Sequence, residues 1–137
     1  MVAVGRLKRR PDFLRVAAGR RRWVAPGLIL QALGRSADGG TADDGPPRVG
    51  FTASAKVGGA VVRNRARRRL RAVAQAVMAA HARVGHDYVL IARAGTVNRR
   101  FDALIGDLEI GLKRLGLYRD EAAARVAAPR TETPDAA

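Results

Sequence analysis

The sequence contains no cysteine, and its most basic stretch contains no acidic residue; the first absence already excludes several classes of site. Without cysteine there is no disulfide framework and no thiolate metal site, which is typical of a protein of the reducing cytoplasm. No apolar run approaches the roughly 20 residues of a membrane span. No apolar segment follows the basic N-terminus as it would in a secretory signal. We therefore expect a cytoplasmic protein that does not contact a membrane.

Residues that could build an active site are also scarce. The only histidines are His81 and His86, and with the neighbouring Asp87 they make a poor metal-ligand set. Gly58 and Gly59 are not followed by the Gly-Lys-Ser/Thr of a nucleotide-binding P-loop. The 12 carboxylates show no pairing suited to acid–base work. We expect no catalytic residue, no metal site and no cofactor on the polypeptide itself.

Positive charge is the property that the chain has in excess. Its 137 residues suffice for one domain with a real core, and they carry a net charge of +14 with a pI near 11.7. Six of the nine residues from Arg63 to Arg71 are arginine, and no acidic residue lies between positions 56 and 83. Clustered charge of one sign at this pI is typical of a nucleic-acid-binding protein.

The basic stretch also has the apolar spacing of an amphipathic helix. At 100° per residue, one sector of about 80° collects six apolar residues: Val62, Ala66, Leu70, Val73, Val77 and Ala80. Like charges three or four residues apart oppose an isolated helix by roughly 0.2–0.5 kcal/mol each. A solvated charged face is one interpretation, but the single sign beside a core stripe favours binding of a polyanion. The chain lacks the helix-turn-helix, zinc-finger and basic-zipper patterns, which favours structured RNA over DNA.

The remaining sequence predicts an α+β domain with the order helix, three strands, basic helix, strand, helix. The predicted elements are a first helix capped by Asp12 and ended by Gly19, strands over 20–24, 28–33 and 48–54, a central strand over 87–93, and a last helix capped by Asn98 and ended by Gly116. Residues 34–47 are expected to form a mobile hairpin loop. The domain is expected to span residues 1–118 and to be followed by a disordered tail over 119–137.

Aromatic residues are few, and their neighbours suggest different roles. Phe51 and Phe101 lie on apolar faces, so we expect both in the core. Phe13 lies on the first predicted helix among arginines, where packing in the core and stacking on an unpaired base are both open. Tyr118 follows the last helix in a basic context.

Residues 54–71 resemble the signature of a known family. They read S-A-K-V-G-G-A-V-V-R-N-R-A-R-R-R-L-R, which is similar to the S-K-K-x-G-N-A-V-x-R-N-R-x-K-R-x-x-R of the bacterial ribonuclease P protein component. Asp12-Phe13 and Leu117-Tyr118 resemble other parts of that family, so the likeness extends over about residues 6–118. The resemblance implies an α-β-β-β-α-β-α sandwich similar to domain 2 of ribosomal protein S5, with a left-handed βαβ crossover.

The resemblance also implies a function, that of the protein subunit of the ribonucleoprotein that removes the 5′ leader from precursor tRNA. The catalytic RNA subunit would perform the hydrolysis, with magnesium at the RNA active site. The implied contacts to the RNA subunit are Arg63, Asn64, Arg65, Arg67, Arg68 and Arg71. The implied contacts to the precursor-tRNA leader are Phe13, Thr52, Ser54, Lys56 and Tyr118. The alternatives are a ribosomal or general structured-RNA-binding protein of similar fold and, third, a free-standing nuclease.

Four positions depart from the family pattern. Ala55 stands where a lysine is usual and Gly59 where an asparagine is usual, so one charge and one polar contact are missing near the cleft that the resemblance implies for the leader. Ala17 and Gln31 stand where many members carry aromatic residues. We therefore expect weaker stacking of the leader and a greater reliance on Phe13 and on phosphate contacts.

Overall fold

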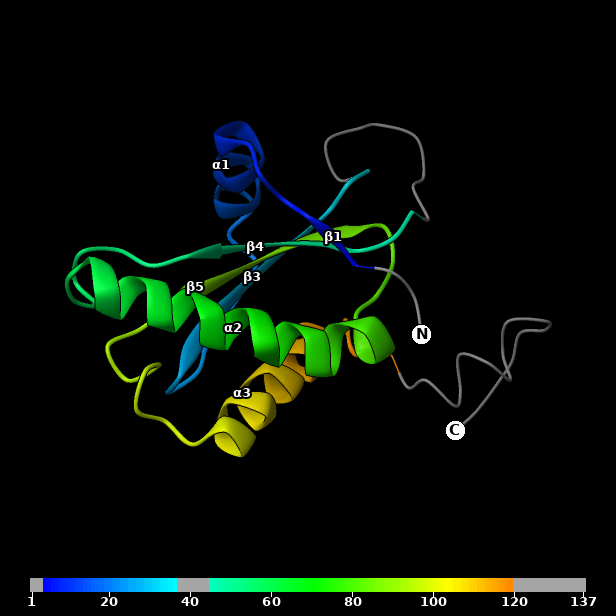
Figure 1. Cartoon of the computed structure of the whole chain (residues 1–137). Helices are drawn as coiled ribbons and strands as arrows, with labels where there is room; N and C mark the ends of the chain where they lie inside the picture. The colour runs from blue at the N-terminus through cyan, green and yellow to red at the C-terminus, as the bar shows by residue number, and fades with distance from the viewer. Residues whose placement is uncertain (1–3, 37–44, 120–137) are drawn as a thin grey trace.

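The structure, a computed structural model, describes residues 4–36 and 45–119. These residues form one α+β domain with a mixed five-stranded sheet and three helices (Figure 1). In chain order the elements are β1 (Gly5–Arg6), α1 (Arg10–Ala18), β2 (Arg22–Val24), β3 (Leu28–Gly34), β4 (Arg48–Thr52), α2 (Ala60–His81), β5 (His86–Ala92) and α3 (Phe101–Arg114). The loop predicted over 34–47 and the tail predicted over 119–137 lie largely outside the described residues. None of the helices within the described ranges is long and apolar enough to cross a membrane.

The sheet has the strand order β1-β4-β5-β3-β2. β4 pairs in parallel with β1 and β5, whereas β3 pairs antiparallel with β5 and β2. The predicted strands are all present, and β2 lies at the sheet edge. β1 was not predicted, because two residues are too few to show an alternating pattern. The basic helix α2 connects the adjacent parallel strands β4 and β5, and the left hand expected for this crossover stays a prediction.

Helices cover both faces of the sheet (Figure 1). α1 packs on one face, where the buried residues are Leu7, Val16 and Val89. α2 and α3 pack on the other face over the larger core, which includes Tyr88 and Leu90. Successive residues of β5 therefore point into different cores, as expected of a strand that is covered on both sides. The prediction of a buried central strand over 87–93 is confirmed.

The apolar stripe of α2 faces the sheet through its middle and C-terminal turns. Ala66, Leu70, Val73 and Val77 are buried, as predicted. Val62 is 36% exposed, so its predicted place in the core is wrong. The first turn of α2 follows a loop that leaves the end of β4, and Figure 1 shows this turn beyond the end of that strand, which agrees with the exposure of Val61 and Val62.

Helix starts were less predictable than helix faces. α1 begins at Arg10 after an N-cap at Arg9, and α3 begins at Phe101 after an N-cap at Arg100. The caps predicted at Asp12 and Asn98 are therefore wrong, because Arg9 and Arg100 occupy the N-cap positions. Neither of these residues makes a side-chain cap hydrogen bond. Pro11 lies in the first turn of α1, where its fixed φ suits the helix and its missing N–H removes no intrahelical bond. Phe101, the first residue of α3, is 41% exposed, which corrects its expected place in the core.

Candidate nucleic-acid interface

The exposed side of α2 carries the densest positive charge of the described residues. Burial of the apolar stripe fixes which way the helix faces, so Arg65 and Arg68 are exposed on the side away from the sheet, while Arg71 lies at the flank beside β4. The helix has no side-chain N-cap bond and no acidic residue in its first turn. Nothing in that turn therefore competes for the charge of the first arginines, and the end of the helix that attracts anions stays free.

The predicted RNA-subunit contacts on α2 differ in how they are held. Arg65 and Arg68 are exposed, and neither forms an ion pair among the described residues. Arg63 donates to the Gly58 carbonyl at 3.1 Å. Arg67 donates to Asn64 Oδ1 at 2.6 Å, which leaves the Asn64 amide as a donor. Arg65 and Arg68 can thus meet phosphate without first breaking an ion pair.

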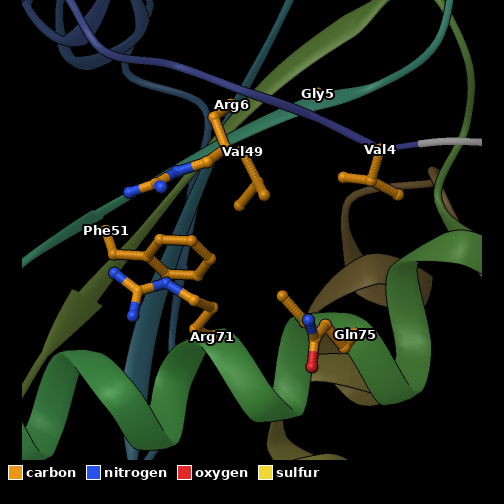
Figure 2. Close-up of a pocket in the computed structure, with 8 residues that line it drawn as sticks. Val4, Gly5, Arg6, Val49, Phe51, Arg71 and Gln75 are labelled. Atoms are coloured by element: carbon orange, nitrogen blue, oxygen red, sulfur yellow. The ribbon is translucent and has the colours of Figure 1, made fainter.

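Arg71 lies on the side of α2 that faces β1 and β4. Its guanidinium carbon is 5.6 Å from the centroid of the Phe51 ring, a cation–π arrangement. Both side chains line a pocket of about 170 Å³ between the helix and the sheet edge, and Figure 2 shows them next to each other, with Gln75 further along the helix. Arg71 is half-buried, and its Nε has no partner among the described residues. The packing holds its charge in one place.

Arg69 belongs to the same basic run, but its side chain forms hydrogen bonds within the domain. Its Nη1 donates to the carbonyl oxygens of Thr96 and Val97 at 2.6 and 2.7 Å. These bonds tie α2 to the loop before α3. The family signature leaves position 69 out of the implied RNA contacts, but no sequence pattern predicts the partners of Arg69, because they lie 27 and 28 residues away in the chain.

Two of the predicted leader contacts lie together. Phe13 and Thr52, with Lys8 and Arg10, line an open depression of about 300 Å³ between α1 and the end of β4. The Phe13 ring lies against Gly50, where a Cβ atom would overlap it. Lys8 and Arg10 were not among the predicted site residues, although the basic character of the N-terminal segment was a signal for them.

The other three predicted leader contacts are more scattered. Ser54 and Lys56 are exposed in the turn between β4 and α2, where the Lys56 amide donates to Ser54 Oγ at 3.3 Å. Tyr118 packs with the α2–α3 core, on the opposite face of the sheet from Phe13. Its ring stacks on His81 with centroids 4.5 Å apart, and Lys113 Nζ lies 4.7 Å from its centroid. The structure therefore does not bring Tyr118 to the Phe13 depression.

A buried carboxylate positions α1 over the sheet. The side chain of Asp87, at the start of β5, has no exposed surface and forms ion pairs with Arg15, Arg35 and Arg48. Burial alone would raise the pKa of Asp87, but hydrogen bonds and charge from Arg48 and Arg35 outweigh it and lower that pKa below its ordinary value. Because Arg15 belongs to α1, this cluster fastens the helix that carries Phe13. The sequence places Asp87 at the start of the central strand and beside His86, but it does not predict the three arginines that surround it.

The histidines also have structural partners. His81 Nδ1 is 2.8 Å from the Arg119 carbonyl oxygen, and His86 Nδ1 is 2.9 Å from that of Val84. Burial and the nearby arginines lower the pKa of His86. Among residues 4–36 and 45–119, no three His, Asp or Glu side chains gather as a metal site would require. No set of these residues is therefore assigned to a metal ion.

Comparison with known proteins identifies relatives of the whole domain. The family model described as Ribonuclease P matches residues 1–116. The chain is 54% identical to the ribonuclease P protein component of Paramagnetospirillum magneticum over 129 residues, 94% of each chain. It is 50% identical to that of Gluconacetobacter diazotrophicus, over 82% of this chain and 91% of the relative.

Solved structures show the same fold. The ribonuclease P protein of Staphylococcus aureus superposes with a TM-score of 0.65 at 23% identity, over 83% of this chain and 97% of that one. The protein from Thermotoga maritima superposes with a TM-score of 0.60 at 22% identity, over 80% and 94% of the two chains.

Proposed function

The chain belongs to the bacterial ribonuclease P protein component family, and from this membership we propose how its surfaces share the work of that enzyme. It is the protein subunit of ribonuclease P, the endoribonuclease of tRNA 5′ maturation, and it associates with the ribonuclease P RNA. In our proposal the polypeptide binds and positions RNA, and the RNA subunit cleaves. Magnesium would be held at the active site of the RNA. That ion would supply the charge that activates water and stabilises the leaving oxygen.

The α2 surface is our proposed docking site for the RNA subunit. The single observation that carries it is that Arg65 and Arg68 are exposed and form no ion pair in the described part of the chain. They lie on a helix whose other face is buried in the core. Arg63, Asn64, Arg67 and Arg71 complete the proposed surface. Arginine suits this role because its planar fork can hold a phosphate through two hydrogen bonds.

The Phe13 depression is our proposed site for the precursor-tRNA leader. It combines an aromatic ring with Lys8 and Arg10, the pairing that binds single-stranded nucleic acid through stacked bases and phosphate contacts. Thr52 lies in the depression, and Ser54 and Lys56 follow it in the chain towards α2. We leave Tyr118 out of this site because it lies across the sheet.

Reconstitution tests the division of labour. Purified protein, a matching RNA subunit and precursor tRNA are combined at low magnesium, and each component is omitted in turn. We expect cleavage only when protein and RNA are both present. Cleavage by the protein alone would contradict the proposal and favour a free-standing nuclease, and a protein without effect on the RNA would favour a general RNA-binding role.

The docking surface has its own test. We expect Arg65→Ala with Arg68→Ala to flatten the plot of log affinity for the RNA subunit against log salt, by roughly 0.7–0.9 for each phosphate that the helix no longer binds. The control removes the same charge elsewhere, from the exposed Arg22 and Arg83. Equal slopes for the two double variants would refute docking through α2.

A further inference from the structure

The first residue of α3 forms a second aromatic and basic site beside α2. Phe101 is 41% exposed, and it is the aromatic residue among the exposed large apolar side chains of the described residues. With Arg65, Arg68, Arg69 and Ala72 it lines an open depression of about 350 Å³. This depression lies on the flank of α2 opposite Arg71 and Phe51, so the helix has an aromatic residue and arginines on both sides.

The parts of this depression are held in fixed relation to one another. Arg69 is bonded to the carbonyl oxygens of residues 96 and 97, so its aliphatic stem forms a wall. Thr96 is buried and donates to the Gly27 carbonyl at 2.6 Å. Arg99 pairs with the nearly buried Asp107 of α3 at 2.6 Å, and Asp107 also accepts the Gly27 amide at 3.0 Å.

These bonds anchor the loop before α3 to the sheet edge, to α2 and to α3 itself. Phe101 follows this loop directly, so the position of its backbone relative to α2 is set before any ligand arrives. A site of this kind loses little conformational freedom on binding.

We propose that this depression binds one unpaired nucleotide of the ribonuclease P RNA. The base stacks on the Phe101 ring, and Arg65 and Arg68 hold the adjoining phosphate. The proposal rests on the proposed function of α2, to which it adds a stacking residue. The chemistry fits because an aromatic face accepts any base, and free guanidinium groups at its edge accept the phosphate that a base carries with it.

The occupant is assigned to the RNA subunit rather than to the precursor-tRNA leader. Arg65 and Arg68, which line this depression, are also the free arginines of the proposed docking surface. The Phe13 depression lies against the other face of the sheet, so one short single strand on Phe13 does not reach Phe101 directly. The acidic Asp102 beside Phe101 is exposed and already pairs with Arg100 at 3.1 Å.

The test compares Phe101→Leu, which keeps apolar bulk but removes the aromatic face, with Phe101→Tyr, which keeps that face. Affinity for the full RNA subunit is measured over a range of salt concentrations. We expect Phe101→Leu to weaken binding by roughly 5- to 150-fold, the worth of one stacked base, and Phe101→Tyr to stay within about twofold of the unchanged protein by the same reasoning. Ile110→Ala is the matched control, because Ile110 is a 49% exposed apolar residue of the same helix.

The salt dependence separates stacking from charge. Stacking releases no counterions, so Phe101→Leu should lower affinity equally at every salt concentration and leave the slope unchanged. Unchanged affinity for Phe101→Leu, or equal losses for Phe101→Leu and Phe101→Tyr, would overturn the inference. A loss of precursor-tRNA affinity with unchanged RNA-subunit affinity would overturn the assigned occupant.

The two proposals can fail separately. If Arg65→Ala with Arg68→Ala flattens the slope while Phe101→Leu changes nothing, the docking surface stands and only the nucleotide site is wrong. If neither variant changes the affinity for the RNA subunit, the assignment of α2 as the docking surface is itself wrong. Photo-crosslinking from a benzoylphenylalanine at position 101 supplies an independent readout. We expect it to label one unpaired region of the RNA, and labelling only in duplex regions would contradict stacking.

Discussion

The cluster around Asp87 provides a test of how this small domain keeps α1 in place. Asp87→Asn removes the negative charge and keeps the shape of the side chain. The three arginines that converge on it come from α1, from the segment after β3 and from β4, so one carboxylate joins three parts of the chain. The substitution leaves their positive charges facing one another without a counterion.

The magnitude follows from the burial of each partner. Removing one partner of a buried ion pair typically costs about 3–5 kcal/mol, because the remaining charge is left uncompensated. Asp87 has no exposed surface, but the side chains of Arg15, Arg35 and Arg48 keep 27%, 12% and 37% exposure. Water can therefore solvate part of the uncompensated arginine charge. We expect a loss of unfolding free energy at the lower end of this range, about 3 kcal/mol. For a domain of this size that loss lowers the unfolding midpoint by roughly 10 °C.

The assay is equilibrium unfolding in urea, followed through Trp23, the single tryptophan of the chain. Asp102→Asn is the matched control, because its pair with Arg100 is 71% and 84% exposed and an exposed pair contributes at most about 1 kcal/mol. A loss of less than about 1 kcal/mol for Asp87→Asn, or a loss equal to that of Asp102→Asn, would refute the reasoning.

The pH dependence gives a second reading of the same variant. The pKa of Asp87 is lower in the folded protein than its ordinary value of 3.8, so its stabilisation is complete above that value and is lost as the pH falls through the folded pKa. The pKa of His86 is also lowered, from 6.5, so wild-type stability already declines below that pH. Subtracting the curve of Asp87→Asn from that of wild type cancels the His86 contribution. We expect the difference to stay constant from pH 7 to about 4.5 and to shrink only below that.

Three further predictions concern the proposed RNA-binding surfaces. Phe13→Ala should weaken the binding of precursor tRNA by roughly 5- to 150-fold relative to the binding of mature tRNA, and it should leave the affinity for the RNA subunit unchanged. Equal losses of affinity for both tRNAs would mean that Phe13 only packs in the core. Gly50→Ala should have a similar but smaller effect in the same competition assay, because the added Cβ overlaps the Phe13 ring and lies 3.1 Å from Leu7 Cβ. Arg71→Lys should weaken RNA-subunit binding although it keeps the charge, because lysine lacks the planar group that lies over Phe51; affinity equal to wild type would contradict a fixed orientation.

The α2 pattern shows how far periodicity alone can predict structure. The repeat of Ala66, Leu70, Val73 and Val77 defines which face of the helix is buried, because a helix can bury only one stripe against a sheet. It could not tell where the sheet ends, so Val62 was wrongly assigned to the core. The expected burial of Phe101 is wrong for the same reason. An apolar residue at the first position of a helix can lie beyond the elements that bury the later turns of that helix.

The predicted site depended on two different kinds of information. The arginine run and the R-N-R signature are enough to predict which helix docks on RNA, because clustered charge and a contiguous motif are both local in sequence. The Phe13 depression needed Thr52 and Gly50 from β4 to lie beside α1, and only the paired strands decide that. Tyr118, which the family resemblance assigned to the leader site with Phe13, lies on the other face of the sheet.

The sequence by itself determined that this chain is a basic α+β domain with a helix that presents arginines, since composition, spacing and signature are properties of the chain. Tertiary structure alone decided which arginines stay free. Arg69 is bonded to the loop before α3 and Arg71 lies against Phe51, whereas Arg65 and Arg68 remain exposed beside Phe101. The physical reason is distance along the chain. Each of these outcomes depends on partners 20 or more residues away, which no local pattern specifies.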